Sequence, residues 1–139
     1  MVNEGQNMSI DPLINAPGMI PSHAIVALLA VVTGGAQLAM PKGTPLHRAL
    51  GFLWVTGMTF VAISGLFIHT LKLIGPFSPI HLLSFVVLVS LWIAIRAARA
   101  GNITTHRKVM VSLYVLSLIV TGAFTFYPGR VMYQVVFGN

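Results

Sequence analysis

The chain has 139 residues, of which 56% are hydrophobic, 7% are charged and none is Cys. Because a soluble domain carries about 25% charged residues, this composition excludes a water-facing globular protein and predicts one integral membrane domain, while the lack of Cys excludes disulfides and thiolate ligands. The net charge of +6 comes from eight basic residues against two acidic ones, and the basic residues cluster beside apolar segments, which is a topology signal and not a nucleic-acid-binding surface.

The predicted elements follow one another clearly along the chain. Residues 1–18 are polar, contain both carboxylates and form an extramembrane arm. Four apolar segments, about 20–40, 49–71, 78–99 and 107–127, each approach the roughly 20 residues that cross a bilayer as a helix. The turn-forming stretches MPKGTP, IGPFSP and AGNITT separate them, and residues 128–139 form an interfacial tail. We therefore predict an all-α, integral membrane four-helix bundle.

The distribution of basic residues predicts the orientation in the membrane. An even number of spans places both termini on one side, together with Lys72 and Arg130. The loops on the opposite side carry six basic residues: Lys42, Arg48, Arg96, Arg99, Arg107 and Lys108. Since cytoplasmic loops are enriched in Lys and Arg, we expect both termini to lie outside and the lipid bilayer to surround the spans.

The two halves of the sequence resemble each other. His23 in PSHAIVALL corresponds to His81 in SPIHLLSFV, and His47 corresponds to His106, each followed by Arg at nearly the same interval. Each half contains two spans, so both copies have the same orientation. This pattern predicts two parallel two-helix repeats related by an axis along the membrane normal.

All five histidines lie near the ends of the predicted spans. His23, His69 and His81 fall at the outer ends, whereas His47 and His106 fall at the inner ends. Small residues recur at three- to four-residue spacing on the same helix faces as the histidines, and such faces are typical of packed helix interfaces in membranes. The histidines are therefore expected to point into the bundle.

Imidazoles that point into a helical bundle are candidate cofactor ligands. Imidazole binds iron, copper and zinc, and haem iron takes axial histidine. We predict two haem b groups, the outer one held by His23 and His81 and the inner one by His47 and His106, with glycines such as Gly34 and Gly65 leaving room for the macrocycle. The candidate partners of the haem propionates are Arg48, Arg107 and Arg130. Such a protein would transfer electrons across or along the membrane, as a membrane oxidoreductase if it is an enzyme, with a quinol or a redox protein as its donor.

Two alternatives belong to other classes. The outer histidines His23, His69 and His81 could together bind a copper or zinc ion with an open coordination position. In the other alternative the chain binds no cofactor, its histidines are polar groups at the interface, and it packs as a homodimer or as an accessory or assembly subunit of a larger membrane complex. No carboxylate follows Asp11, which argues against a carboxylate proton relay in the spans.

The order of these signals resembles a known family. HRALGFLWV, ISGLFIH, GPFSPIHLLSF, ARAGNITTHRKVMVSLY and TGAFTFYPGR follow one another over residues 20–135. This order is similar to that of a family of small bacterial four-helix predicted membrane proteins of unknown function, and the elements around His106, Arg107 and Met110 and the ending Pro128-Gly129-Arg130 are the most distinctive. The resemblance implies a multi-pass protein of the bacterial inner membrane. A likeness to b-type membrane cytochromes concerns only the architecture and the histidine positions, which do not fix a function.

Overall fold

A computed structural model describes residues 8–68 and 79–138, and within these ranges it contains helices and no strand. The helices are α1 (Asp11–Ile14), α2 (Ile20–Ala39), α3 (Pro45–Leu66), α4 (Pro79–Arg99), α5 (Ile103–Ser112), the π-helical η1 (Leu113–Val120), α6 (Thr121–Phe124) and α7 (Val131–Phe137). Among the described residues, four helices are long and apolar enough to cross a membrane, namely α2, α3, α4 and the continuous α5–η1–α6. The predicted all-α fold with four spans is confirmed.

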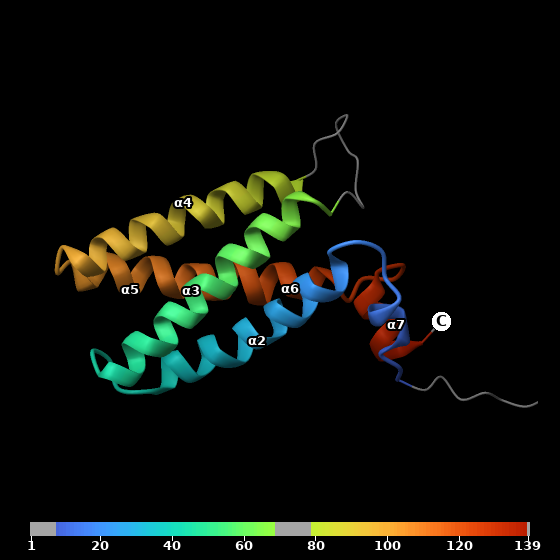
Figure 1. Cartoon of the computed structure of the whole chain (residues 1–139), viewed down its shortest axis with the longest axis horizontal. Coiled ribbons are helices and arrows are strands. Elements are labelled where there is room, and N and C mark those ends of the chain that lie inside the picture. The colour runs from blue at the N-terminus through green and yellow to red at the C-terminus, as the bar shows by residue number, and fades with distance from the viewer. Residues whose placement is uncertain (1–7, 69–78, 139) are drawn as a thin grey trace, which may run out of the picture.

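The four spans form a closed ring in which each helix packs on its neighbour in the chain. Helix α2 packs on α3, α3 on α4 and α4 on α5, and η1 returns to α2 (Figure 1). The short turns 40–44 and 100–102 lie at one end of the bundle, which we call the turn end. Helices α1 and α7 pack on each other at the opposite end, the terminal end, where Ser9 N–H donates to the Val135 carbonyl at 3.2 Å.

Capping residues decide where two of the spans begin. The Thr44 hydroxyl accepts a hydrogen bond from His47 N–H at 3.1 Å, and Pro45 occupies the first turn, where its missing N–H has no cost. Asn102 caps α5 in the same way by accepting from Thr105 N–H at 3.1 Å. Both helices therefore begin about one turn before the apolar segments predicted from hydropathy, and the two histidine–arginine pairs lie inside their first turns.

The turn end is also closed by specific contacts. After α4, Gly101 has a φ of 75°, Asn102 N–H donates to the Ala97 carbonyl at 2.8 Å and Gly101 N–H donates to the Ala98 carbonyl at 3.2 Å. This is the Schellman arrangement, which needs a residue free to adopt a left-handed conformation. The Lys42 ammonium donates to three carbonyl oxygens at the end of α2, at 2.7–2.8 Å, and so satisfies groups that the helix leaves unpaired.

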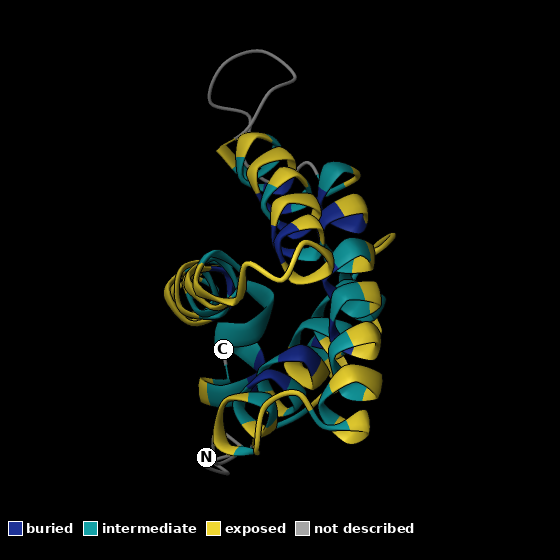
Figure 2. Cartoon of the chain, turned by 90° about the vertical axis from the view of Figure 1, so that its left-hand side faces the viewer, coloured by how far each residue is buried: buried dark blue, intermediate teal, exposed yellow. Residues whose placement is uncertain are grey.

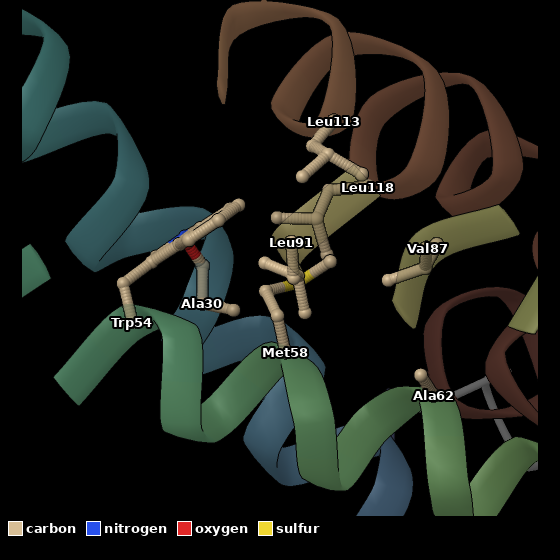
Figure 3. Packing of buried hydrophobic residues seen from close by; sticks show 8 residues of the cluster. All are labelled: Ala30, Trp54, Met58, Ala62, Val87, Leu91, Leu113 and Leu118. Atoms are coloured by element: carbon tan, nitrogen blue, oxygen red, sulfur yellow. The ribbon is translucent and has the colours of Figure 1, made fainter. Parts of the chain in front are cut away.

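The core lies between the four spans and is apolar. Its buried residues are Ala30, Trp54, Met58, Ala62, Val87, Leu91, Leu113 and Leu118 (Figure 3). Met58 is 1% exposed and lies at the centre of the group. Trp54 donates its indole N–H to the Ala30 carbonyl at 2.9 Å, so its one polar group is satisfied within the core. The faces of α2 and α3 that carry small residues at three- to four-residue spacing are the buried ones, as predicted.

The fourth span departs from that spacing. Its middle segment, η1, is π-helical, and its buried residues Leu113 and Leu118 lie five positions apart. A π-helix pairs residues five positions apart and so turns the buried face away from the one that an α-helix would present. Tyr114 in this segment donates its hydroxyl to the Val31 carbonyl of α2 at 3.1 Å, which closes the ring between the first and last spans.

The outward faces of the spans are exposed and apolar. Figure 2 views the bundle from the turn end, and exposed residues cover the outer sides of the helices. Large side chains on these faces include Phe52 at 77%, Phe85 at 65% and Trp92 at 58% exposure. Exposed apolar area of this extent is unfavourable in water but suits the hydrocarbon of a bilayer.

Candidate functional site

His23 joins α2 to α3 at the terminal end. Its Nδ1 lies 2.8 Å from the Ser64 hydroxyl oxygen. Ser64 is fully buried, and its hydroxyl donates to the Val61 carbonyl at 3.1 Å. The imidazole and the hydroxyl are therefore paired, and either one donates according to the tautomer of the ring.

Helix α4 also packs beside the His23–Ser64 pair, next to Gly65 of α3. A Cβ added to Gly65 would lie 3.0 Å from the Ser84 hydroxyl oxygen of α4 and 3.6 Å from Cε1 of His23. The glycine lets side chains of α2 and α4 approach the backbone of α3, which is the usual role of small residues in membrane helix packing. The space expected for a haem macrocycle at Gly65 is occupied by these side chains.

The space at Gly34 is filled as well. A Cβ there would lie 2.6 Å from Cδ2 of Tyr114 and 2.7 Å from Nε1 of Trp54. The glycine therefore serves to seat two aromatic rings against α2. Both glycines therefore have a packing role, and a cofactor beside them stays a prediction.

His81 also binds α3. Its Nε2 lies 3.0 Å from the Leu66 carbonyl oxygen, which can only accept, so Nε2 carries the proton of this bond. His23 and His81 thus each hydrogen bond to the last turns of α3. His69 lies outside the described residues, so the copper or zinc site of His23, His69 and His81 stays a prediction; within residues 8–68 and 79–138 no three His, Asp or Glu side chains form a metal-binding group.

His106 joins α5 to α4 at the turn end. Its Nδ1 lies 3.0 Å from the Ala94 carbonyl oxygen. A carbonyl cannot donate, so Nδ1 carries the proton and Nε2 carries the lone pair. Metal-bound histidines commonly show this arrangement, in which a carbonyl fixes the ring orientation and leaves the other nitrogen free to bind.

His47 differs from the other described histidines. Its Nδ1 is buried and has no hydrogen-bond partner among the described residues, and the same is true of Oε1 of Gln37. Gln37 is held beside it, because its Nε2 donates to the His47 carbonyl at 2.9 Å. Buried polar atoms without partners are rare and call for an explanation, which marks the turn end as the better candidate site.

The three arginines predicted beside the cofactor lie close to the ends of the bundle. Arg48 and Arg107 are exposed and each follows a turn-end histidine in the first turns of α3 and α5. Arg130 is partly exposed and directly precedes α7. Their roles as partners of haem propionates stay predictions.

Three polar residues that lie beside the histidines were not predicted as site residues from the sequence. Ser64 and Ser84 are the buried polar side chains of the described spans, and Gln37 supplies one of the two unpaired buried atoms. Each stands in an otherwise apolar segment close to a span end. That position is the signal by which they could have been found.

Residues 20–137 match the family described as predicted membrane protein DUF2306. The chain belongs to this family. The membership confirms the resemblance seen in the sequence, and with the four candidate spans it identifies an integral membrane protein of a family whose function is unknown. No curated protein and no solved structure matches the chain, so the likeness to b-type cytochromes is not shown.

Proposed function

We propose that this protein binds haem b at the turn end through His47 and His106 and transfers electrons across or along the membrane. The observation that carries the proposal is the unpaired, buried Nδ1 of His47 in a bundle where His106 presents a free Nε2. These nitrogens come from the first turns of α3 and α5, two helices that lie across the ring from each other. Bound haem would supply one-electron chemistry.

The protein's own contribution at this site is orientation and an apolar surrounding. The Ala94 carbonyl fixes the proton of His106 on Nδ1, so Nε2 needs no rearrangement before it can bind a metal. The buried Nδ1 of His47 carries a cost of about 1–3 kcal/mol while it lacks a partner. A ligand that pairs with this atom would recover part of that cost.

The terminal end supports a second haem less well. His81 uses Nε2 for the Leu66 carbonyl, and the space beside Gly65 is taken by His23 and Ser84. Binding of an outer haem by His23 and His81 would require the His81 bond to break. We therefore place the first cofactor at the turn end.

The test is the visible spectrum of the full chain purified in mild detergent, recorded oxidised and after reduction with dithionite. We expect b-type bands that are lost in His106→Ala and in His47→Ala and are retained in the matched control His23→Ala at the terminal end. Circular dichroism verifies that the variants remain helical. Loss of the bands in His23→Ala alone would place the haem at the wrong end for this proposal. A colourless protein overturns it, with bound copper or zinc indicating an ion-binding protein and metal-free co-purification with a larger complex indicating an accessory subunit.

A second measurement uses the protein freed of haem, because bound haem would itself stabilise the wild type. Replacing an unpaired buried nitrogen by an apolar ring of similar shape is close to neutral or stabilising, so His47→Phe should unfold no more easily than the wild type. His106→Phe should lose about 1 kcal/mol, because it removes the bond to Ala94. A large loss of stability in His47→Phe would show that His47 has a structural partner and would remove the observation on which the proposal rests.

A further inference from the structure

A second surface of the fourth span, separate from the histidines, has its own chemistry. A hollow of about 730 Å³ on α5 and the start of η1 is lined by Ile103, Thr104, Arg107, Lys108, Val111 and Ser112. Thr104, Arg107 and Lys108 are exposed. His106 and Met110, which belong to the same helix, face α4 and the core instead. The hollow therefore faces away from the bundle, toward the surrounding membrane.

The charge of this hollow is not balanced within the protein. Asp11 is the only acidic side chain in the described ranges; it lies in α1 at the terminal end and hydrogen bonds to Ser9. Two other basic residues of the turn end have partners, since Lys42 binds three carbonyls and the Arg96 guanidinium lies 4.9 Å from the centre of the Trp92 ring. Arg107 and Lys108 thus form an adjacent pair of cations on the lipid-facing side, where an external anion is the available counter-charge.

We propose that this hollow binds the headgroup of an anionic phospholipid. Arg and Lys bind phosphate through charge-assisted hydrogen bonds, and the hydroxyls of Thr104 and Ser112 border the same space. Ile103 and Val111 supply apolar contacts for the glycerol and the upper acyl chains. The position also fits, because the hollow lies in the first three turns of a span, at the level where headgroups meet the hydrocarbon.

The expected strength follows from the two charges. Each Lys or Arg near a membrane surface contributes about 1 kcal/mol to the attraction of anionic lipid. Removal of both charges should weaken lipid binding about 30-fold, because every 1.4 kcal/mol corresponds to a factor of ten in affinity. The preference should be for the charged headgroup, with acyl chains held constant.

The experiment is a native mass spectrometry titration of the detergent-purified full chain with dioleoyl phosphatidylglycerol, compared with dioleoyl phosphatidylcholine. We expect tighter binding of phosphatidylglycerol, a loss of about 30-fold in the double variant Arg107→Gln with Lys108→Gln, and a change of less than threefold in the matched control. That control is Arg48→Gln with Arg99→Gln, which removes the same charge from the same end of the bundle and leaves the hollow intact.

Several results would overturn the proposal. Equal losses in the two double variants would show only a general effect of surface charge, and equal binding of the two lipids would show no headgroup site. Displacement of the lipid by inorganic phosphate at equal concentration would mean that the hollow recognises free phosphate. If the charge variant fails to fold, Thr104→Ala with Ser112→Ala decides: a loss of threefold or more supports the site, and a smaller change overturns it.

Discussion

Gly34→Ala tests how tightly the first and last spans are packed. The new Cβ would lie 2.6 Å from Cδ2 of Tyr114 and 2.7 Å from Nε1 of Trp54, both too close for real contacts. Either ring must move, and each ring donates a hydrogen bond to α2 that movement would strain. Overpacking costs about 1–3 kcal/mol and a lost hydrogen bond about 1 kcal/mol. Since alanine recovers at most about 1 kcal/mol of helix propensity, we expect a net destabilisation of about 2 kcal/mol.

The assay is unfolding of the purified protein in mixed micelles by increasing SDS, followed by the fluorescence of Trp54. This side chain is 3% exposed, so its emission should respond to loss of packing, whereas Trp92 is already 58% exposed. The matched control is Gly57→Ala, whose Cβ would meet Cγ1 of Val26 at an ordinary 3.6 Å and which should be neutral or slightly stabilising. A stability of Gly34→Ala within about 0.5 kcal/mol of the wild type, the range of an ordinary surface change, would refute the close packing, as would an equal loss in the control.

Three further substitutions probe other contacts by the same unfolding assay. Ser64→Ala removes the partner of His23 and should cost about 1–3 kcal/mol, as expected when a buried polar group is left unpaired; Thr56→Ala, which loses only an exposed bond within its own helix, should change stability by about 0.5 kcal/mol or less. Thr44→Ala removes the cap of α3 and should cost about 1 kcal/mol, and a neutral result would show that water replaces the cap. Met58→Ala opens a cavity at a side chain that is 1% exposed and should cost about 2–5 kcal/mol; a loss below 1 kcal/mol would mean that the core collapses around the deletion.

Hydrophobic spacing predicted the first two spans well because they are regular α-helices. The inward face of α3 follows from Trp54, Met58 and Ala62, which recur every four residues and are all buried. In the fourth span Tyr114 follows His106 and Met110 at four-residue intervals, and its side chain does contact α2. The four-residue spacing did not predict the burial of Leu118, because a π-helical segment changes which residues share a face. No local feature of the sequence indicates that this segment is π-helical.

The histidine positions could be predicted, but their partners could not. Hydropathy places His23 and His106 at span ends, yet each binds a group on a neighbouring helix, Ser64 and the Ala94 carbonyl. Such bonds depend on how the helices are rotated and offset, which the pattern within one helix does not specify. The helix caps at Thr44 and Asn102 are local signals, and they could have located both histidine–arginine pairs inside the helices.

The histidines differ in whether they bind a neighbouring helix or keep a buried nitrogen that a ligand could bind. His23, His81 and His106 each hydrogen bond to the helix next in the ring, so each has a structural reason to be polar within an apolar span. His47 has no such bond from its buried Nδ1, and the nearby Oε1 of Gln37 has none either. An apolar residue in place of Gln37 would lose its bond to the His47 carbonyl, so helix packing explains that side chain, whereas packing gives no reason for a polar ring at His47. The polarity of His47 is therefore explained more simply by the ligand that we propose at the turn end than by helix packing.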